Sequence, residues 1–159
     1  MLQKAFGQRR AWSELSDLAE NSDFSEEQDR VNEFEFLEAE AARKTSLIVE
    51  AALDLKAEAL VGLDMRRVSA FADTFLITSG RSSRHVRSIA ESIIQSLCEA
   101  GKAPLGVEGL REGRWVLIDA NEAVVHVFEA ETREEFALER LWSDAPLLDL
   151  GQSLEASAS

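Results

Sequence analysis

Residues 74–91 read TFLITSGRSSRHVRSIAE, a short strand-like run followed at once by an amphipathic helical pattern. The residues of Thr74–Thr78 are mostly β-branched or aromatic, which favours a strand that ends at Ser79–Gly80. Ser82 or Ser83 can cap the helix that follows, and Gly101 can end it. The apolar stripe of this helix consists of Val86, Ile89, Ala90, Ile93 and Leu97. A strand that leads directly into such a helix predicts an α/β domain.

The segments on either side extend this unit into a sheet with helices around it. Upstream, we expect a helix that begins at Thr45 or Ser46 and then a strand at 61–65. Downstream, we expect a short strand through Val107, a hairpin of strands at 115–119 and 124–128, and a helix at 132–142, with Pro146 ending the ordered region. This order of elements predicts a mixed five-stranded sheet covered by helices, an α/β sandwich.

The first 44 residues differ from the rest in composition. Residues 11–40 carry 11 acids against Arg30, a net charge of −10, whereas residues 45–149 carry 18 acids and 11 bases. Trp12, Leu15 and Leu18 indicate one weak helix and residues 26–44 a second, each too short to persist alone. We therefore divide the chain into an acidic, largely flexible N-terminal extension (1–44), a folded domain (45–149) and a flexible tail (150–159). The extension either stays disordered or folds onto a partner or onto the arginines of residues 66–87.

The composition of the whole chain excludes several classes of protein. With 159 residues, 45% of them hydrophobic, the chain can bury one core without a disulfide or a metal. Its formal charge of −13 disfavours nonspecific binding to phosphate backbones and membranes and favours a basic partner. No apolar run fits a membrane span or a signal peptide, and Cys98 is the single cysteine. We therefore expect a cytoplasmic prokaryotic protein without a metal or cofactor.

Charge is also uneven within the predicted domain. Residues 66–87 carry five arginines against Asp73, a net charge of +4, and residues 105–139 carry nine acids against three arginines, a net charge of −6. One interpretation is a set of solvated faces. The other is a surface with two electrostatic ends, one of which meets a basic partner.

Candidate catalytic motifs are scarce. The turn Ser79–Ser83, between strand and helix, is a place where backbone amides often hold phosphates, but it lacks the glycines and the Lys-Ser or Lys-Thr of a phosphate loop. Asp64, Asp73 and Asp119 stand singly, so the convergent carboxylates of a two-metal transferase are absent. A nucleotide-binding or nucleotidyl-transferring enzyme that uses this turn remains the alternative hypothesis.

Isolated polar and aromatic residues have structural interpretations beside the functional ones. Capping explains Ser82 and Ser83, and a surface position explains His85, better than a serine nucleophile does. His126 shares a strand face with apolar neighbours and is expected to be a core or half-buried histidine. Trp115 begins a strand after a polar turn, so a core role and an interface role are equally open.

From about Leu47 to Trp142 the chain resembles the ribosomal silencing factor family, also called RsfS or Iojap. The resemblance rests on four runs in matching order and spacing: FADTFLITSGRSSRHVRSIAE (71–91), GVEG (106–109), WVLIDANEAVVHVF (115–128) and LERLWSDAP (138–146). Thr74 and Phe136 stand where the family commonly has tyrosine, and the acidic residues 1–44 lie outside the resemblance.

The resemblance implies a binding protein rather than an enzyme, with a fold related to nucleotidyltransferases that lacks their catalytic carboxylates. It implies a translational repressor that binds the large ribosomal subunit through the fourteenth large-subunit protein, blocks subunit association and in some members aids large-subunit assembly. Because ribosomal proteins are typically basic, the acidic region 105–139 is the expected docking surface.

The docking candidates are three kinds of residue. Apolar anchors and charged partners in the acidic region are Leu105, Val107, Trp115, Leu117, Glu108, Asp119 and Glu122. Arg84 and His85 are secondary candidates, for a minor contact with ribosomal RNA or with another protomer, and a helix-capping role is the equal alternative for both. Homodimerisation through an exposed sheet edge also stays open.

Overall fold

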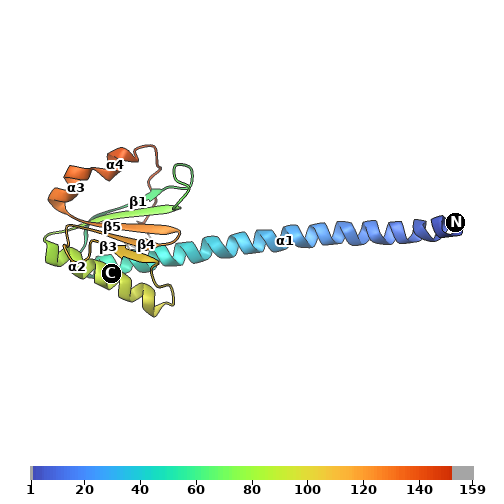
Figure 1. Cartoon of the computed structure of the whole chain (residues 1–159), viewed down its shortest axis with the longest axis horizontal. Helices are drawn as coiled ribbons and strands as arrows, with labels where there is room; N and C mark the ends of the chain where they lie inside the picture. The colour runs from blue at the N-terminus through green and yellow to red at the C-terminus, as the bar shows by residue number, and fades with distance from the viewer. Residues whose placement is uncertain (1, 152–159) are drawn as a thin grey trace. The chain divides into compact units, whose positions relative to one another are not determined.

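The computed structural model describes the backbone of residues 2–151 and the side-chain surroundings from residue 25 onward (Figure 1). Contacts within the chain divide it into residues 1–40 and residues 41–159. Most of the predicted flexible tail, residues 150–159, lies outside the described residues.

The N-terminal segment forms one helix, α1 (Leu2–Asp54). Two weak helices and a separate helix capped at Thr45 or Ser46 were the wrong expectation, because both of these residues lie inside α1. No proline occurs before Pro104, so nothing in residues 2–54 removes a helical hydrogen bond. The flexibility predicted for residues 1–44 stays a prediction.

A single sheet organises residues 41–151. Its strands run in the order β1-β2-β5-β4-β3, with β2 and β5 parallel and every other neighbouring pair antiparallel. The strands are β1 (Glu58–Asp64), β2 (Thr74–Gly80), β3 (Gly106–Glu108), β4 (Trp115–Ala120) and β5 (Ala123–Glu129). The predicted mixed five-stranded sheet is therefore confirmed, as is the hairpin between β4 and β5.

Helices cover both faces of the sheet (Figure 1). On one face lie α2 (Ser83–Glu99) and the last turns of α1, which bury the main core with alternate residues of β4 and β5. The Ser82 hydroxyl accepts a hydrogen bond from the backbone N–H of His85 and so caps α2, as predicted. On the other face lie α3 (Ala130–Phe136) and α4 (Leu138–Leu141), over a smaller core around Phe128 and Met65.

Two expectations near the C-terminus were wrong. The helix predicted for 132–142 is broken at Ala137, whose φ of 46° lies in the left-handed region. The ordered chain also continues past Pro146, because Leu147 bridges to Leu63 and the N–H of Leu148 donates to the Gly62 carbonyl at 2.8 Å. This return segment covers the outer edge of β1, which would otherwise present unpaired backbone groups.

Candidate functional site

The strands β3 and β4 bring four of the predicted site residues together on one edge of the sheet. Glu108 lies opposite Leu117, and Asp119 lies opposite Gly106. Because alternate residues of a strand point to the same side, Glu108, Leu117 and Asp119 share the face that carries α3 and α4 elsewhere on the sheet. Leu105 precedes β3, and its backbone lies beside that of Asp119, since its N–H donates to the Asp119 carbonyl at 2.7 Å.

These four residues combine an exposed apolar group with carboxylates, and we call Leu105, Glu108, Leu117 and Asp119 the β3–β4 patch. Leu105 is 72% exposed and Glu108 is exposed, while Leu117 and Asp119 are half-buried. The Asp119 carboxylate accepts a hydrogen bond from the N–H of Asn121 at 3.0 Å, so it also caps the hairpin end. The strand β3 is at the edge of the sheet, and no described segment pairs with its outer side.

Two predicted site residues do not belong to this patch. Val107 lies opposite Ile118 and packs against the main core, on the other face of the sheet. Glu122, in the turn after β4, forms an ion pair with Lys44, whose ammonium also donates to the Ala120 carbonyl at 2.9 Å. Burial raises the pKa of Glu122, but the hydrogen bond from Lys44 and its positive charge outweigh this effect and hold the pKa below its ordinary value. Glu122 therefore ties α1 to the hairpin.

Trp115 is half-buried in an aromatic cluster rather than standing free as an anchor. Its ring centroid lies 5.0 Å from that of Phe128 and 4.8 Å from that of Phe136. Its indole N–H donates to Nδ1 of His126 at 3.1 Å. Because His126 is only 4% exposed, it is the predicted core histidine, and desolvation lowers its pKa to about 4.

The turn Ser79–Ser83 is occupied by internal contacts. Ser79 accepts a hydrogen bond from the Arg133 guanidinium at 2.8 Å, and Ser82 caps α2. A Cβ on Gly80 would lie 2.9 Å from the backbone nitrogen of Val86, so the turn packs closely against the helix.

His85 is a structural residue, and the expectation that a surface position explains it was wrong. Nδ1 of its half-buried ring accepts from the N–H of Arg81 at 3.0 Å, which leaves Nε2 to donate to the Leu55 carbonyl at 2.6 Å. The ring thus joins the start of α2 to the end of α1. Arg84, its neighbour, has an exposed side chain.

The predicted single carboxylates form no metal site among the described residues. Asp64 is bound by Arg66, whose hydrogen bonds and charge keep its pKa below the ordinary value. Within the part of the chain that the structure describes, no three His, Cys, Asp or Glu residues gather where they could share a metal ion. The geometry therefore offers no described metal site to the alternative enzyme hypothesis.

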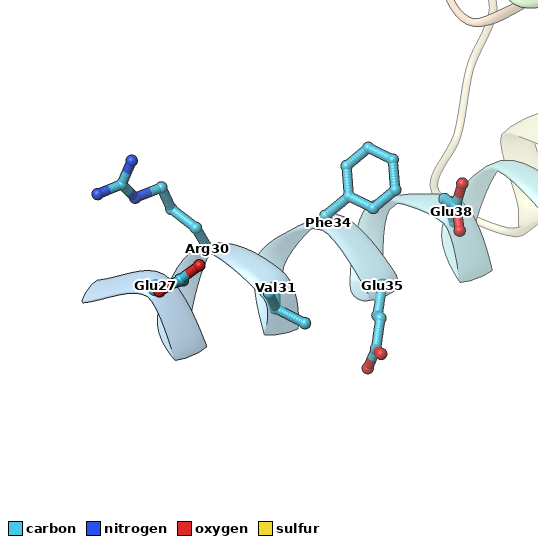
Figure 2. Close-up of a pocket in the computed structure, with 6 residues that line it drawn as sticks. All are labelled: Glu27, Arg30, Val31, Phe34, Glu35 and Glu38. Atoms are coloured by element: carbon cyan, nitrogen blue, oxygen red, sulfur yellow. The ribbon is translucent and has the colours of Figure 1, made fainter. Parts of the chain in front are cut away.

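The sequence did not predict that several large apolar residues are exposed. Phe71 is 94% exposed, Leu141 is 69% exposed, and Phe136 beside Trp115 is 50% exposed. Their sequence contexts resemble those of buried residues, so no periodicity distinguishes them. A pocket on α1 is lined by side chains of this one helix: Glu27, Arg30, Val31, Phe34, Glu35 and Glu38. Figure 2 shows that Arg30 and Phe34 point to one side of the helix and Val31 and Glu35 to the other. The pocket is a groove along neighbouring side chains rather than an enclosed cavity.

No helix in the described part of the chain is long and apolar enough to cross a membrane.

Comparisons with known proteins agree on one family. The family model described as ribosomal silencing factor during starvation matches residues 38–159. Ribosomal silencing factor RsfS of Bacillus subtilis (strain 168) is 44% identical over 110 residues, which cover 68% of this chain and 93% of that protein. The Mus musculus protein named mitochondrial assembly of ribosomal large subunit protein 1 is 30% identical over 77 residues, which cover 46% of this chain and 33% of that protein.

A solved structure shows the same fold. The crystal structure of a protein from Chromobacterium violaceum matches with a TM-score of 0.63 and 33% identity, over 64% of this chain and 85% of that chain. Because the family model spans well over half of the sequence, the chain belongs to the ribosomal silencing factor family.

Proposed function

We propose that this chain binds the large ribosomal subunit, chiefly through the fourteenth large-subunit protein, and represses translation by blocking subunit association. Membership of the silencing-factor family supports this function. The name of the mouse relative supports a second role, in assembly of the large subunit. The proposal assigns no catalytic step, cofactor or metal to the chain.

The observation that carries the proposal is the β3–β4 patch. Leu105 is 72% exposed on an edge of the sheet where Glu108 and Asp119 flank the apolar Leu117. An apolar contact surrounded by carboxylates is complementary to a basic protein surface. The carboxylates would raise the rate of encounter and set the orientation, and the apolar side chains would supply most of the affinity.

Repression follows from occupancy alone. A protein seated on the face of the large subunit that meets the small subunit excludes the small subunit sterically. The affinity for the large subunit then sets the fraction of subunits that cannot join. A second copy of the chain that paired with the outer edge of β3 would compete for the same patch, because Leu105 and Glu108 lie on that edge.

Charge reversal within the patch tests the proposal. We expect Glu108→Lys and Leu105→Asp each to weaken co-sedimentation with purified large subunits by about tenfold or more, as loss of an interface anchor does. Both side chains are exposed, so neither change removes core packing. Affinity is measured by pelleting at increasing subunit concentration, and subunit joining by sucrose-gradient profiles.

Matched controls lie elsewhere on the same domain. Glu91→Lys on α2 and Leu141→Asp on α4 make the same chemical changes at exposed positions outside the patch. Unchanged binding by both patch variants, or equal loss in patch and control variants, would show that the proposed docking face is wrong. Trp115→Ala is a poorer test, because it also removes the stacking on Phe128 and the hydrogen bond to His126.

A further inference from the structure

A group of arginines from two separate segments meets at one end of the sheet. Arg84 and Arg87 belong to the first turns of α2, and Arg111 and Arg114 belong to the turn between β3 and β4. We call these four residues the arginine cluster. Arg87 donates to the Arg111 carbonyl at 3.2 Å, which joins the two segments directly.

The turn is pressed against the start of the helix. A Cβ on Gly113 would lie 2.5 Å from the carbonyl oxygen of Ser83 and 3.1 Å from Cγ of Arg87. Gly113 also has a φ of 70°, a backbone conformation that residues with side chains rarely adopt. Only glycine therefore allows this close approach, which brings the turn that carries Arg111 and Arg114 against the start of α2.

Two acidic residues lie near the cluster, Glu112 in the turn and Glu129 beside Arg114, but neither forms a described ion pair with it. Among the described ion pairs, none joins a carboxylate to any of the four arginines. Arg84, Arg111 and Arg114 are exposed, and the first turn of α2 contains no acidic residue. Glu112 is the one acid within the turn that carries Arg111 and Arg114. In a chain with a formal charge of −13, such a local excess of guanidinium groups points to an external anion.

We propose that the arginine cluster binds the phosphate backbone of RNA. A guanidinium group is planar and always charged, and it matches a phosphate with two parallel hydrogen bonds. The turn that carries Arg111 and Arg114 connects the two strands of the β3–β4 patch. In a single docking orientation, the patch can therefore contact a ribosomal protein while the cluster contacts RNA. That shared orientation rests on the proposed function, whereas phosphate binding by the cluster does not.

RNA is favoured over two other polyanions by the surroundings of the cluster. Its four members are all arginines, and no exposed large apolar residue occurs in 81–88 or 109–114 to enter a lipid bilayer. An acidic peptide would offer isolated carboxylates, whereas an RNA strand repeats its phosphates along the surface that the two segments form.

The direct test measures binding of the full chain to a fluorescein-labelled duplex RNA of about 16 base pairs by fluorescence anisotropy. We expect Arg84→Gln combined with Arg111→Gln to weaken binding about tenfold at about 50 mM KCl, and to lower the salt dependence by about the contribution of two phosphate contacts. Both side chains are exposed and make no described hydrogen bond, so the fold is unaffected. Arg67→Gln combined with Arg140→Gln removes the same charge from exposed positions outside the cluster and should leave binding unchanged.

The outcomes separate this inference from the proposed function. Equal affinity of wild type and cluster variant for the duplex, equal loss in the control variant, or binding to phosphatidylglycerol vesicles in place of RNA would overturn the inference. Pelleting with large subunits supplies a second readout, because the cluster variant should bind subunits more weakly and with a shallower salt dependence. If the wild-type chain did not pellet at all, the proposed function would fail while the duplex measurement still decided the inference.

Discussion

At the scale of single residues, the position of His126 in the sheet determines the surroundings of its two ring nitrogens. Its Nδ1 accepts the Trp115 indole N–H, which orients the aromatic cluster beside the patch. Its Nε2 is buried and has no hydrogen-bond partner among the described residues. Burial was predictable, since alternation along 124–128 places His126 with apolar neighbours. Its hydrogen bond with Trp115 was not predictable, because this bond depends on the register between β4 and β5. In that register Leu117, not Trp115, lies opposite His126.

The neutral state of His126 predicts a loss of stability in mild acid. Burial lowers its pKa from 6.5 to about 4 in the folded chain, whereas in the unfolded chain it titrates near 6.5. As pH falls from about 6.5 toward 4, the unfolded state takes up the proton first, so the free energy of unfolding should fall by about 3 kcal/mol in total. Urea unfolding at steps of pH measures the slope.

Replacement of the ring provides the control. His126→Gln should flatten the slope between about pH 6.5 and 5, whatever its effect on stability at neutral pH. Asp64 and Glu122 have lowered pKa values, so the stability that they contribute is lost only at lower pH. A slope that survives in His126→Gln would contradict the assignment.

At the scale of elements, propensity and pattern predicted what is local and failed where tertiary contacts decide. The capping of α2 by Ser82 and the strand after Asp73 follow from adjacent residues. The break between α3 and α4 does not, because Ala137 is a good helix former that adopts a φ of 46°. The segment after Pro146 pairs with β1, a contact between residues far apart in the chain.

The strained backbone of Ala137 makes it a site for stabilisation. An alanine in the left-handed region is strained by about 1 kcal/mol, and a glycine there is not. Glycine also makes the unfolded chain more flexible, which offsets part of this gain in stability. We expect Ala137→Gly to raise the free energy of unfolding by about 0.5 kcal/mol, measured by urea titration. Ala42→Gly, at an exposed position inside α1 and without a positive φ, should lower it by about 0.5–1 kcal/mol. Destabilisation by both variants would show that strain at Ala137 is negligible.

At the scale of the whole molecule, charge is organised by the fold more sharply than by the sequence. The sequence separates an arginine-rich region from an acidic one, yet Arg111 and Arg114 lie in the middle of the acidic region. The fold separates these arginines from the acidic residues, because the turn after β3 lies against α2 whereas Glu108 and Asp119 lie on the patch. Val107 and Glu122 are predicted docking residues because they lie in the acidic region of the sequence. In the fold they lie elsewhere, since Val107 packs against the main core and Glu122 pairs with Lys44.

The division of the chain predicts that residues 41–159 fold without residues 1–40. Every side chain described from residue 25 to 39 is exposed, so removing this part of α1 uncovers no core. The core instead requires Ile48, Val49 and Ala52, which are fully buried in the next turns. In circular dichroism, the fragment 41–159 should lose helical signal but keep its unfolding midpoint within about 3 °C of the full chain, since a shift of that size corresponds to less than about 1 kcal/mol.

A fragment that begins at Leu55 should fail to fold, because burial of each large aliphatic side chain contributes about 1.5–3 kcal/mol and folded domains are only marginally stable. The patch lies inside the shorter fragment, so 41–159 should also still pellet with large subunits. A large drop in its midpoint would place part of the core within residues 1–40. An unchanged midpoint with lost pelleting would instead assign the acidic helix a direct part in docking.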